Sequence, residues 1–588
     1  MKILHNHIGF ERVGPKRAVV RAVPGLAGAS FSLISQPEGA VVHEGRLDES
    51  GEVDNWRRGE WYFYTLDFSS FEGSGVFSLR IDTSRPGSGS VNVVETHEFA
   101  IRDEILLKGT LSESLDYFKT QRCSGQFDRK DRKTSFYGAR REGEVDLHGG
   151  WYDASGDTSK YLSHLSYANF MNPQQTPLLP WVFVTVADSL APETHALDVT
   201  LRRRLLDEAV HGGDFLVRMQ DVEGYFYMTV FDRWSKDLDE REVCAYATQE
   251  GTKFTSWESG FRQGGGMAIA ALAKLSMQGV EGAFGSARYL ETAIRGFSHL
   301  EQCNTQYLDD GTENIIDDYC ALLAAVELFR ATQRDEYLVA ARSRVSNLLG
   351  RLDKDEKFAN WWRADGNGRP YFHAAEAGLP VVSLCMYHGV EPDATRQQEV
   401  AVAVEAALRF ELDVTSRAVN PFGYARQYVR PLGGERRDAF FIPHENESGY
   451  WWQGENARLG SLATAARLGA RLVADDPQLV ARLERYAQDQ LDWILGRNPF
   501  DLCMLHGRGR NNPSYENGYP PTCGGVCNGI TSGFEDERDI DFAPESCKDR
   551  GDQIWRWGEQ WLPHAAWYVL AIGCRGRLAA AVDIVDAD

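Results

Sequence analysis

Long apolar runs are absent from this sequence of 588 residues. No stretch approaches the roughly 18 apolar residues that a membrane-spanning helix needs. The first residues, Met1–His7, also lack the continuous apolar core of a secretion signal. We therefore expect a cytoplasmic protein without a membrane partner.

Positive charge is in short supply. The sequence has 63 Lys and Arg residues against 85 Asp and Glu residues, so its formal net charge is −22. A protein that binds nucleic acid or an anionic membrane needs a surplus of basic residues to meet the phosphates. The composition argues against both partners and is compatible with neutral or cationic ligands. General solubility explains the same acidic surplus.

Cysteine is also scarce. The ten cysteines are scattered along the chain, which is typical of reduced intracellular proteins rather than of a disulfide framework. Cys523 and Cys527 are close together, with Cys503 and Cys547 nearby, but the paired spacing of a zinc site is missing and we do not expect zinc. No EF-hand pattern is present, although the Asp- and Asn-rich loops leave room for a structural calcium ion. No cofactor is expected to be required.

The first part of the chain has the pattern of a small β-sandwich. Residues 16–23, 30–35 and 75–81 are short, partly alternating segments with turn residues between them, and 61–64 is an aromatic strand candidate. A chain of this length is expected to form more than one core. The sequence therefore predicts a β domain over residues 1–103.

Residues 104–588 change to a helical period. Near residue 495, an apolar helical face is followed by Gly496 and Pro499, which together form a helix stop. About twelve helices are predicted by such faces, over residues 107–122, 160–190, 200–219, 259–277, 284–303, 315–332, 335–351, 372–386, 394–411, 450–473, 477–496 and 560–582. Their number predicts a barrel of helical hairpins. The long loops at 123–159, 412–449 and 497–558 are expected to carry function.

The segment Gly149–Asp157 is the strongest chemical signal. It places Asp153 and Asp157 four residues apart, beside Trp151 and Tyr152. Aromatic rings stack on the apolar faces of sugars, and a carboxylate can take a proton from water. The simpler alternative is that Asp157 caps the start of a helix.

Several motifs occur in a characteristic order: Tyr117–Cys123, His148–Asp153, Arg262–Ala273, Leu495–Pro499 and Gly558–Trp561. Together they resemble glycoside hydrolase family 9, in the variant with an N-terminal immunoglobulin-like domain. The resemblance covers nearly the whole chain. It implies an immunoglobulin-like β-sandwich followed by an (α/α)6 barrel, and inverting hydrolysis of β-1,4-linked sugars.

An inverting glycosidase needs one carboxylic acid for the leaving oxygen and one carboxylate to activate water. By order, Asp157 matches the base and Asp153 its partner on the water, although the two roles can be exchanged. Glu559 is the acid candidate, because neighbouring tryptophan rings are expected to keep it protonated; otherwise it is a first-turn acid of the last helix. The substrate-binding candidates are His148, Trp151, Tyr152, Trp451, Trp452, His506, Arg508, Trp555, Trp557 and Trp561.

Two departures from the family pattern fall at substrate-facing positions. Ser155 widens the usual spacing of the two Asp residues from three to four. After Asn498 and Pro499, the His-His-Arg segment that helps to hold the sugar in this family is replaced by His506–Asn512. His506 and Arg508 are therefore only substitutes for those sugar-binding residues. In both departures the sequence resembles the intracellular, exo-acting members of the family. These include exo-β-glucosaminidases that act on chitosan-type oligosaccharides. The acidic loop Phe534–Asp541 favours an ammonium group by charge, or is a solvated loop.

The sequence therefore predicts an exo-acting β-glycosidase on short β-1,4-linked oligosaccharides, with exo-β-D-glucosaminidase favoured. A β-glucosidase, a cellobiohydrolase or an endo-β-1,4-glucanase on cello-oligosaccharides is the alternative. A non-catalytic sugar-binding protein is a distant alternative, since binding alone does not need a separate acid and base. The sequence leaves the oligomeric state open, and the N-terminal domain is expected to pack on the barrel and support it.

Overall fold

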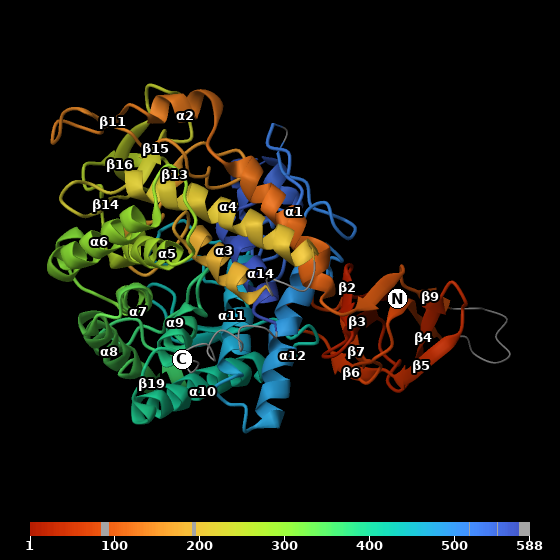
Figure 1. Cartoon of the computed structure of the whole chain (residues 1–588). Coiled ribbons are helices and arrows are strands. Elements are labelled where there is room, and N and C mark those ends of the chain that lie inside the picture. The colour runs from red at the N-terminus through yellow and green to blue at the C-terminus, as the bar shows by residue number, and fades with distance from the viewer. Residues whose placement is uncertain (84–92, 191–195, 517, 550, 576–588) are drawn as a thin grey trace.

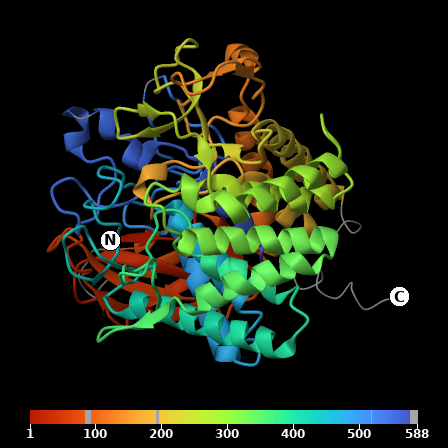
Figure 2. The ribbon, with the colours of Figure 1, turned by 90° about the vertical axis from the view of Figure 1, so that its left-hand side faces the viewer.

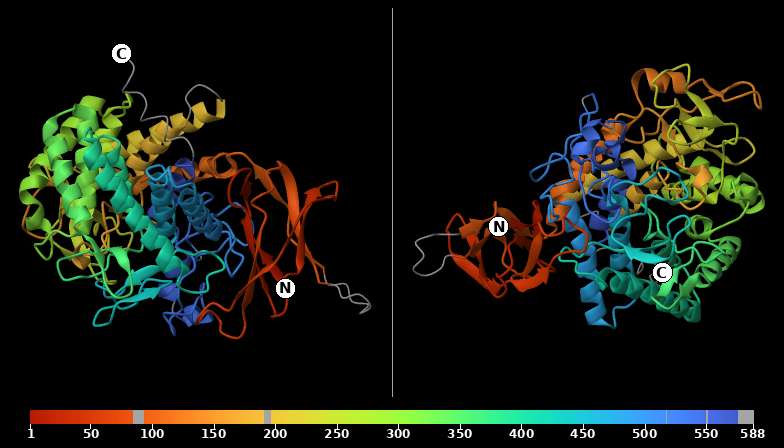
Figure 3. Two further views of the ribbon diagram at one scale, coloured as in Figure 1. Left: turned by 90° about the horizontal axis from the view of Figure 1, so that it is seen from below. Right: turned by 180° about the vertical axis from the view of Figure 1, so that it is seen from behind.

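The computed structural model describes residues 1–83, 93–190, 196–516, 518–549 and 551–575. A β-sandwich, red in Figure 1, lies to one side of a larger helical domain that occupies the rest of the chain. Figure 3 shows the same arrangement from below and from behind. Within the described residues, no helix is long and apolar enough to cross a membrane.

Two sheets form the N-terminal sandwich, in agreement with the β pattern of the sequence. Alternate residues of their strands, such as Phe31, Leu33, Leu66 and Leu79, are buried between them. One sheet has the order β1 (Lys2–Leu4), β3 (Arg17–Ala22), β7 (Tyr62–Asp67) and β6 (Asp48–Gly51). The other has β2 (Gly9–Glu11), β10 (Phe99–Arg102), β8 (Gly75–Asp82), β4 (Ser30–Gln36) and β5 (Val41–Arg46), and β9 (Val93–Glu95) pairs with β8.

The helical domain is an (α/α)6 barrel. Its inner ring closes through contacts between α3 (Leu178–Ser189), α5 (Gly266–Ser276), α7 (Ile315–Thr332), α9 (Leu379–His388), α11 (Asn456–Gly469) and α14 (Leu562–Gly573). The helices outside this ring are α1 (Ile105–Gln121), α4 (Ala196–Arg218), α6 (Ser286–Tyr307), α8 (Asp335–Leu349), α10 (Ala394–Ser416) and α12 (Pro477–Ile494). In Figure 2 the green helices of this barrel lie side by side.

The inner helices are buried on nearly every face because protein surrounds them on all sides. Every residue of α14 is buried, and so is nearly every residue of α5. Small residues let their backbones approach closely: a Cβ atom added at Gly460 of α11 would lie 2.9 Å from the backbone of Trp567 in α14. This packing explains the Gly- and Ala-rich helices of the sequence.

Several helix predictions differ from the structure. Those over 372–386 and 450–473 begin too early, because α9 starts at Leu379 and α11 at Asn456. Residues 160–177, predicted as helix, contain β13 (Lys160–Tyr161) and a short 3-10 turn (Ser166–Ala168), because the side chains of Tyr161, His164 and Gln175 bind the carboxylates of the catalytic loop. Residues 261–265 form a π-turn before α5, in which Gly264 has φ of 99°. The last helix begins at Leu562 rather than at 560, since Pro563 suits the first turn of a helix. The predicted part after residue 575 lies outside the described residues.

Between the barrel helices, the long connections form small sheets and short helices. The sheet that matters for the site has the order β12 (Glu144–Val145), β11 (Thr134–Phe136), β16 (Glu242–Ala247), β15 (Thr229–Phe231) and β13, with β17 (Thr252–Phe254) paired to β16. The remaining pairs are β14 (Phe226–Tyr227) with β18 (Glu258–Ser259), β19 (Leu352–Lys354) with β20 (Ala359–Trp362), and β21 (Gln427–Val429) with β22 (Arg437–Ala439). The short helices are α2 (Gly125–Asp131), α13 (Trp555–Gly558), Glu545–Asp549 and Gly551–Gln553.

The sandwich packs on the barrel, mainly against α12 and the loops near it. Trp56 is fully buried, with its ring centroid 4.5 Å from that of Phe440 and 6.0 Å from that of Trp493. Arg17 forms a buried ion pair with Asp489 at 3.0 Å. Strand β10 ends at Arg102 and α1 begins at Ile105, whereas the domain boundary at residue 103 stays a prediction.

Candidate active site

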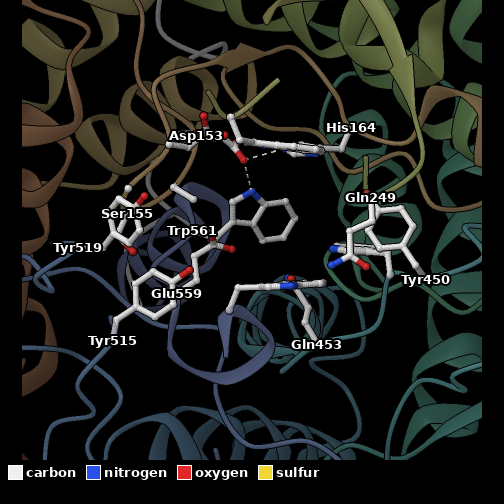
Figure 4. A pocket seen from close by; sticks show the side chains of 16 residues that line it. Asp153, Ser155, His164, Gln249, Tyr450, Gln453, Tyr515, Tyr519, Glu559 and Trp561 are labelled. Atoms are coloured by element: carbon white, nitrogen blue, oxygen red, sulfur yellow. Dashed lines mark hydrogen bonds and ion pairs between the residues drawn. The ribbon is translucent and has the colours of Figure 1, made fainter. Parts of the chain in front are cut away.

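One cavity of about 310 Å³ gathers most of the chemistry that the sequence singled out. It is built by loops that lead into the inner helices α3, α5, α11 and α14, and by the loop that follows α12 (Figure 4). The residues that line it are Asp153, Ala154, Ser155, Gly156, Asp157, His164, Trp234, Gln249, Tyr450, Trp451, Gln453, Tyr515, Tyr519, Trp555, Glu559 and Trp561.

Asp153 is almost fully buried and saturated with hydrogen-bond donors. Its Oδ2 atom accepts hydrogen bonds from His164 Nε2 at 2.7 Å and from Trp561 Nε1 at 2.9 Å, and its Oδ1 atom accepts one from Gln175 (Figure 4). This carboxylate is therefore held in one orientation.

His164 is itself oriented by a second partner. Its Nδ1 atom faces the hydroxyl group of Tyr246 on β16. Burial raises the pKa of Tyr246 well above its ordinary value, so the phenol keeps its proton and donates a hydrogen bond to Nδ1. The ring hydrogen on Nε2 is then the one that is donated to Asp153.

Asp157 is half-buried and is held mostly by backbone groups. Its Oδ1 atom accepts hydrogen bonds from the backbone N–H groups of Thr158 at 2.6 Å and Ser159 at 2.7 Å, and its Oδ2 atom accepts one from the Tyr161 hydroxyl at 3.1 Å. The segment after Asp157 is a strand rather than the helix of the simpler alternative. Burial, followed by repulsion from Asp232 and Asp153, raises the pKa of Asp157 to about 7.

A buried charge cluster supports this catalytic loop from below. Lys160 pairs with Asp131 at 2.6 Å, and Arg241 pairs with both Asp131 and Asp232. All four side chains are fully buried, so each charge depends on its partners in the cluster. Arg241 also donates to the carbonyl oxygen of Thr158 at 2.6 Å, which ties the cluster to the loop.

Glu559 lies in the extended linker between α13 and α14, and not in the first turn of the last helix. Its surroundings differ from those of the two Asp residues, because Trp555, Trp561 and Tyr515 line the same part of the cavity. Burial, with repulsion from Asp153 and Asp157, raises the pKa of Glu559 well above its ordinary value. The raised pKa favours the protonated carboxyl group, which is the form that can donate a proton.

The family follows from two matches along the sequence. The model of glycosyl hydrolase family 9 matches residues 108–516, and that of the cellulase N-terminal ig-like domain matches residues 1–86. The first match spans more than half of the chain. The chain belongs to glycosyl hydrolase family 9. It is a glycoside hydrolase with an N-terminal immunoglobulin-like domain, as the sequence motifs predicted. No curated protein matches the sequence significantly.

Solved structures of this family share the fold along nearly the entire chain. A metagenome-derived family 9 endoglucanase is 18% identical, with a TM-score of 0.64 and coverage of 97% of this chain and 98% of that one. A family 9 protein of Bacteroides ovatus is 18% identical, with a TM-score of 0.63 and the same coverage. AaCel9A, in complex with cellobiose-like isofagomine, is 17% identical, with a TM-score of 0.61 and coverage of 97% and 99%.

In this family 9 chain, six of the predicted site residues lie together in the cavity: Asp153, Asp157, Trp451, Trp555, Glu559 and Trp561. The other seven do not line it. Trp151 is fully buried, with its ring against those of Phe183 and His211, and has no surface that a sugar can contact. Trp557 is also fully buried, beside Trp452, because both rings belong to the core under the cavity.

The remaining predicted residues have other partners. His148 pairs with Asp146 at 2.6 Å, and Tyr152 bonds to the backbone of Ser124. Trp452 stacks on His444, with 3.8 Å between ring centroids. Arg508 pairs with Glu113, and His506, half-buried, also lies outside the cavity lining.

Sequence reasoning missed the residues that complete the lining. Tyr515 and Tyr519 lie further along the same loop than His506 and Arg508 and reach the cavity instead of them. Aromatic residues in a long loop were the available signal for both. Tyr450 and Gln453 flank the predicted Trp451, whereas His164, Trp234 and Gln249 lie in stretches without any motif.

The acidic loop 534–541 is used for structure and not for the cavity. Glu537 pairs with Arg437, and Asp541 pairs with Arg57 of the sandwich at 2.9 Å. None of its side chains lines the cavity. In the described part of the chain, no three His, Cys, Asp or Glu side chains are grouped closely enough to hold a metal ion.

Proposed function

We propose that this family 9 enzyme is an inverting, exo-acting β-glycosidase, and specifically an exo-β-D-glucosaminidase that acts on chitosan-type oligosaccharides. Glu559 is the general acid, Asp157 the general base, and Asp153 the partner that orients the water. The reaction needs no metal or other cofactor, because a carboxylic acid and a carboxylate supply both proton transfers. Short oligosaccharides can enter a cell, which fits the cytoplasmic location that we also propose.

The opposite surroundings of the carboxyl groups support these roles. Burial and the neighbouring carboxylates raise the pKa of Glu559, which favours the protonated form that can give its proton to the leaving oxygen. Asp157 has a pKa of about 7, so that it takes up a proton readily near neutral pH. Asp153 is held in one orientation by His164, Gln175 and Trp561, which suits the role of the group that orients the water.

The charge of the cavity carries the amino-sugar assignment. Three carboxyl groups line it, and no Lys or Arg of the described residues does. Glu516, next to Tyr515, adds a further negative charge close enough to oppose ionisation of Glu559. A cavity with charge of one sign attracts a ligand of the other sign. The ammonium group of glucosamine has this charge, whereas glucose is neutral.

A contact between two loops supports exo action. Trp234 and Tyr519 line the cavity, and the Lys236 Nζ atom lies 4.1 Å from the ring centroid of Tyr519. The loop after β15 and the loop after α12 therefore meet beside the catalytic loop. A cleft that is closed on one side accepts the end of a chain, and not its middle.

A cellulase-type activity is the second candidate. The aromatic lining suits glucose rings equally well, and the titles of similar structures name an endoglucanase and a complex with cellobiose-like isofagomine. A non-catalytic sugar-binding protein is disfavoured, since binding does not need an acid and a base in different surroundings.

The deciding experiment compares hydrolysis of glucosamine disaccharide, N-acetylated disaccharide and cellobiose by the purified enzyme. Because a carboxylate that meets an ammonium contributes more than about 1.4 kcal/mol, we expect kcat/KM on glucosamine disaccharide to exceed that on cellobiose by well over tenfold. On longer chitosan oligosaccharides, monosaccharide is expected from the first turnover. Equal rates on glucosamine disaccharide and cellobiose would contradict the glucosaminidase proposal and favour the cellulase-type candidate.

A further inference from the structure

Asp232 contacts the same two residues that hold the proposed base. It follows β15 directly and is fully buried. Its Oδ2 atom accepts a hydrogen bond from Thr158 Oγ1 at 2.6 Å, and its Oδ1 atom accepts one from Ser159 Oγ at 2.9 Å. The backbone N–H groups of these residues donate to Asp157. Asp232 thus binds the side chains of the Thr158–Ser159 turn, and Asp157 binds its backbone amides.

Asp232 is itself fixed by further partners. Arg241 donates to its Oδ2 atom at 3.2 Å, and the backbone N–H of Trp234 donates to its Oδ1 atom at 3.1 Å. Since Trp234 lines the cavity, the same carboxylate joins the catalytic loop to a part of the cavity wall. Four donors from three segments leave Asp232 a single orientation.

The charge of Asp232 also acts on Asp157. Among the charged groups near Asp157, Asp232 opposes its ionisation most strongly, ahead of Asp153, whereas His164 favours ionisation. The titratable groups that face Asp157 are Asp153, Tyr161, His164, Asp232, Tyr246, Tyr515 and Glu559. Arg241 faces Asp232 and balances part of its charge.

We propose that Asp232 is a positioning residue, which clamps the Thr158–Ser159 turn around Asp157 and sets the electrostatic surroundings of this base. It does not line the cavity. The inference rests on the proposed function, because it takes Asp157 as the base. If it holds, the strength of the base is set by a residue on another strand, outside the cavity lining.

The pH dependence of kcat/KM in Asp232→Asn tests this claim. Removal of the negative charge lowers the pKa of Asp157, so the acid limb of the profile should move down by at least about one pH unit. Asp317→Asn is the matched control: Asp317 pairs with Arg262 at 3.2 Å, and both side chains are fully buried, as are Asp232 and Arg241. The control should lose similar stability and keep the native acid limb. An Asp232→Asn profile that coincides with the control overturns the proposal.

A second variant covers the case in which Asp232→Asn does not fold. Thr158→Val combined with Ser159→Ala removes both hydroxyl contacts and changes no charge. We expect kcat to fall about tenfold or more, as small misplacements of a catalytic group do, with KM and the acid limb nearly unchanged. A native kcat would contradict the clamp.

Failure of the proposed function gives a different result. If the native enzyme cleaves none of the β-linked disaccharides, the reaction assigned to the site is wrong and Asp232 has no base to position. If the native enzyme is active and Asp232→Asn keeps the native acid limb, only the role of Asp232 falls.

Discussion

On one side of the cavity, Asp153 and Asp157 accept hydrogen bonds from neighbouring side chains and backbone amides. On the other side, Glu559 lies among tryptophan and tyrosine rings, and three negative charges oppose its ionisation. The same chemical group therefore meets a polar network on one side and an apolar wall on the other. Such opposite surroundings separate a general base from a general acid.

The difference has a structural origin. The two Asp residues belong to a loop that a buried ion cluster and three strands support, so their oxygens meet many donors. Glu559 belongs to a three-residue link between helices, whose neighbours in the cavity are mostly aromatic. From this difference we expect substitutions to reduce turnover in a definite order. Loss of the acid should have the largest effect, and changes far from the cavity the smallest.

Replacement of the acid should have the largest effect. Glu559→Gln keeps the size of the side chain but cannot donate the proton, so kcat on a disaccharide should fall by about 10²–10⁴-fold. Aryl glycosides with good leaving groups should be partly spared, because they need less protonation. Glu336→Gln, at an exposed position of α8 far from the cavity, serves as the control. Near-native turnover of Glu559→Gln on disaccharides would remove Glu559 from the mechanism.

Loss of either carboxylate on the base side should be the next largest effect. Asp157→Ala and Asp153→Ala should each lower hydrolysis at least about 10²-fold. A glycosyl fluoride of inverted anomeric configuration separates their roles, since an enzyme without its base keeps its acid and its sugar site and can run the reverse reaction. We expect the Asp157 variant to accumulate that product well. If the Asp153 variant accumulates this product instead, Asp153 is the base and Asp157 is the partner that orients the water.

The pH dependence follows from the raised pKa values. The base works when ionised, so activity should rise through a pH of about 7, where Asp157 loses its proton. The unfolded state releases the same proton near pH 4, so between about pH 4 and 7 the folded state binds more protons. The free energy of unfolding should therefore fall as pH rises across this window.

Asp157→Asn checks this stability effect by thermal unfolding at several pH values. The variant lacks the titrating group, so its melting temperature should decline less than that of the native enzyme between pH 4 and 8, by about a few degrees. Tyr161→Phe, which removes one neutral contact of Asp157, is a control that keeps the decline. Parallel curves for native enzyme and Asp157→Asn would show that Asp157 titrates at its ordinary pH.

The smallest effect on turnover is expected far from the cavity. Trp56→Ala removes the ring that joins the sandwich to Phe440 and Trp493 of the barrel. It should lower the free energy of unfolding by about 3–5 kcal/mol, as loss of a buried Trp does, and leave kcat of the folded protein unchanged. Chemical denaturation and initial rates measure the two quantities. A large loss of kcat would mean that the sandwich supports the site as well as the fold.

Local patterns predicted the parts of this molecule that local forces decide. The helical faces placed α7 at residues 315–332, because its apolar and capping residues are close in sequence. Residues 160–177 do not form the predicted helix, because the side chains of Tyr161, His164 and Gln175 bind Asp157 or Asp153 and override the helical pattern.

In the site, too, local motifs predicted some residues, whereas the position of others depends on how the chain folds. Asp153, Asp157 and Glu559 were predicted because motifs mark them, and the structure brings them into one cavity. Trp151 was predicted to meet a sugar, yet its ring is buried, since a sequence does not tell which side of a loop an aromatic residue faces. Tyr519 was missed because only the folded loop brings it beside Gly156, where an added Cβ atom would lie 2.3 Å from the ring.

The anomeric configuration of the first product tests the central claim most directly. A water activated by Asp157 attacks from the face opposite to the bond that Glu559 protonates, so a β-linked substrate must yield an α product. Proton NMR during the first turnovers, before mutarotation, distinguishes the two anomers. We expect the α anomer of the released sugar to appear first. A β anomer at early times would mean retention, and the division of the cavity into an acid side and a base side would be wrong.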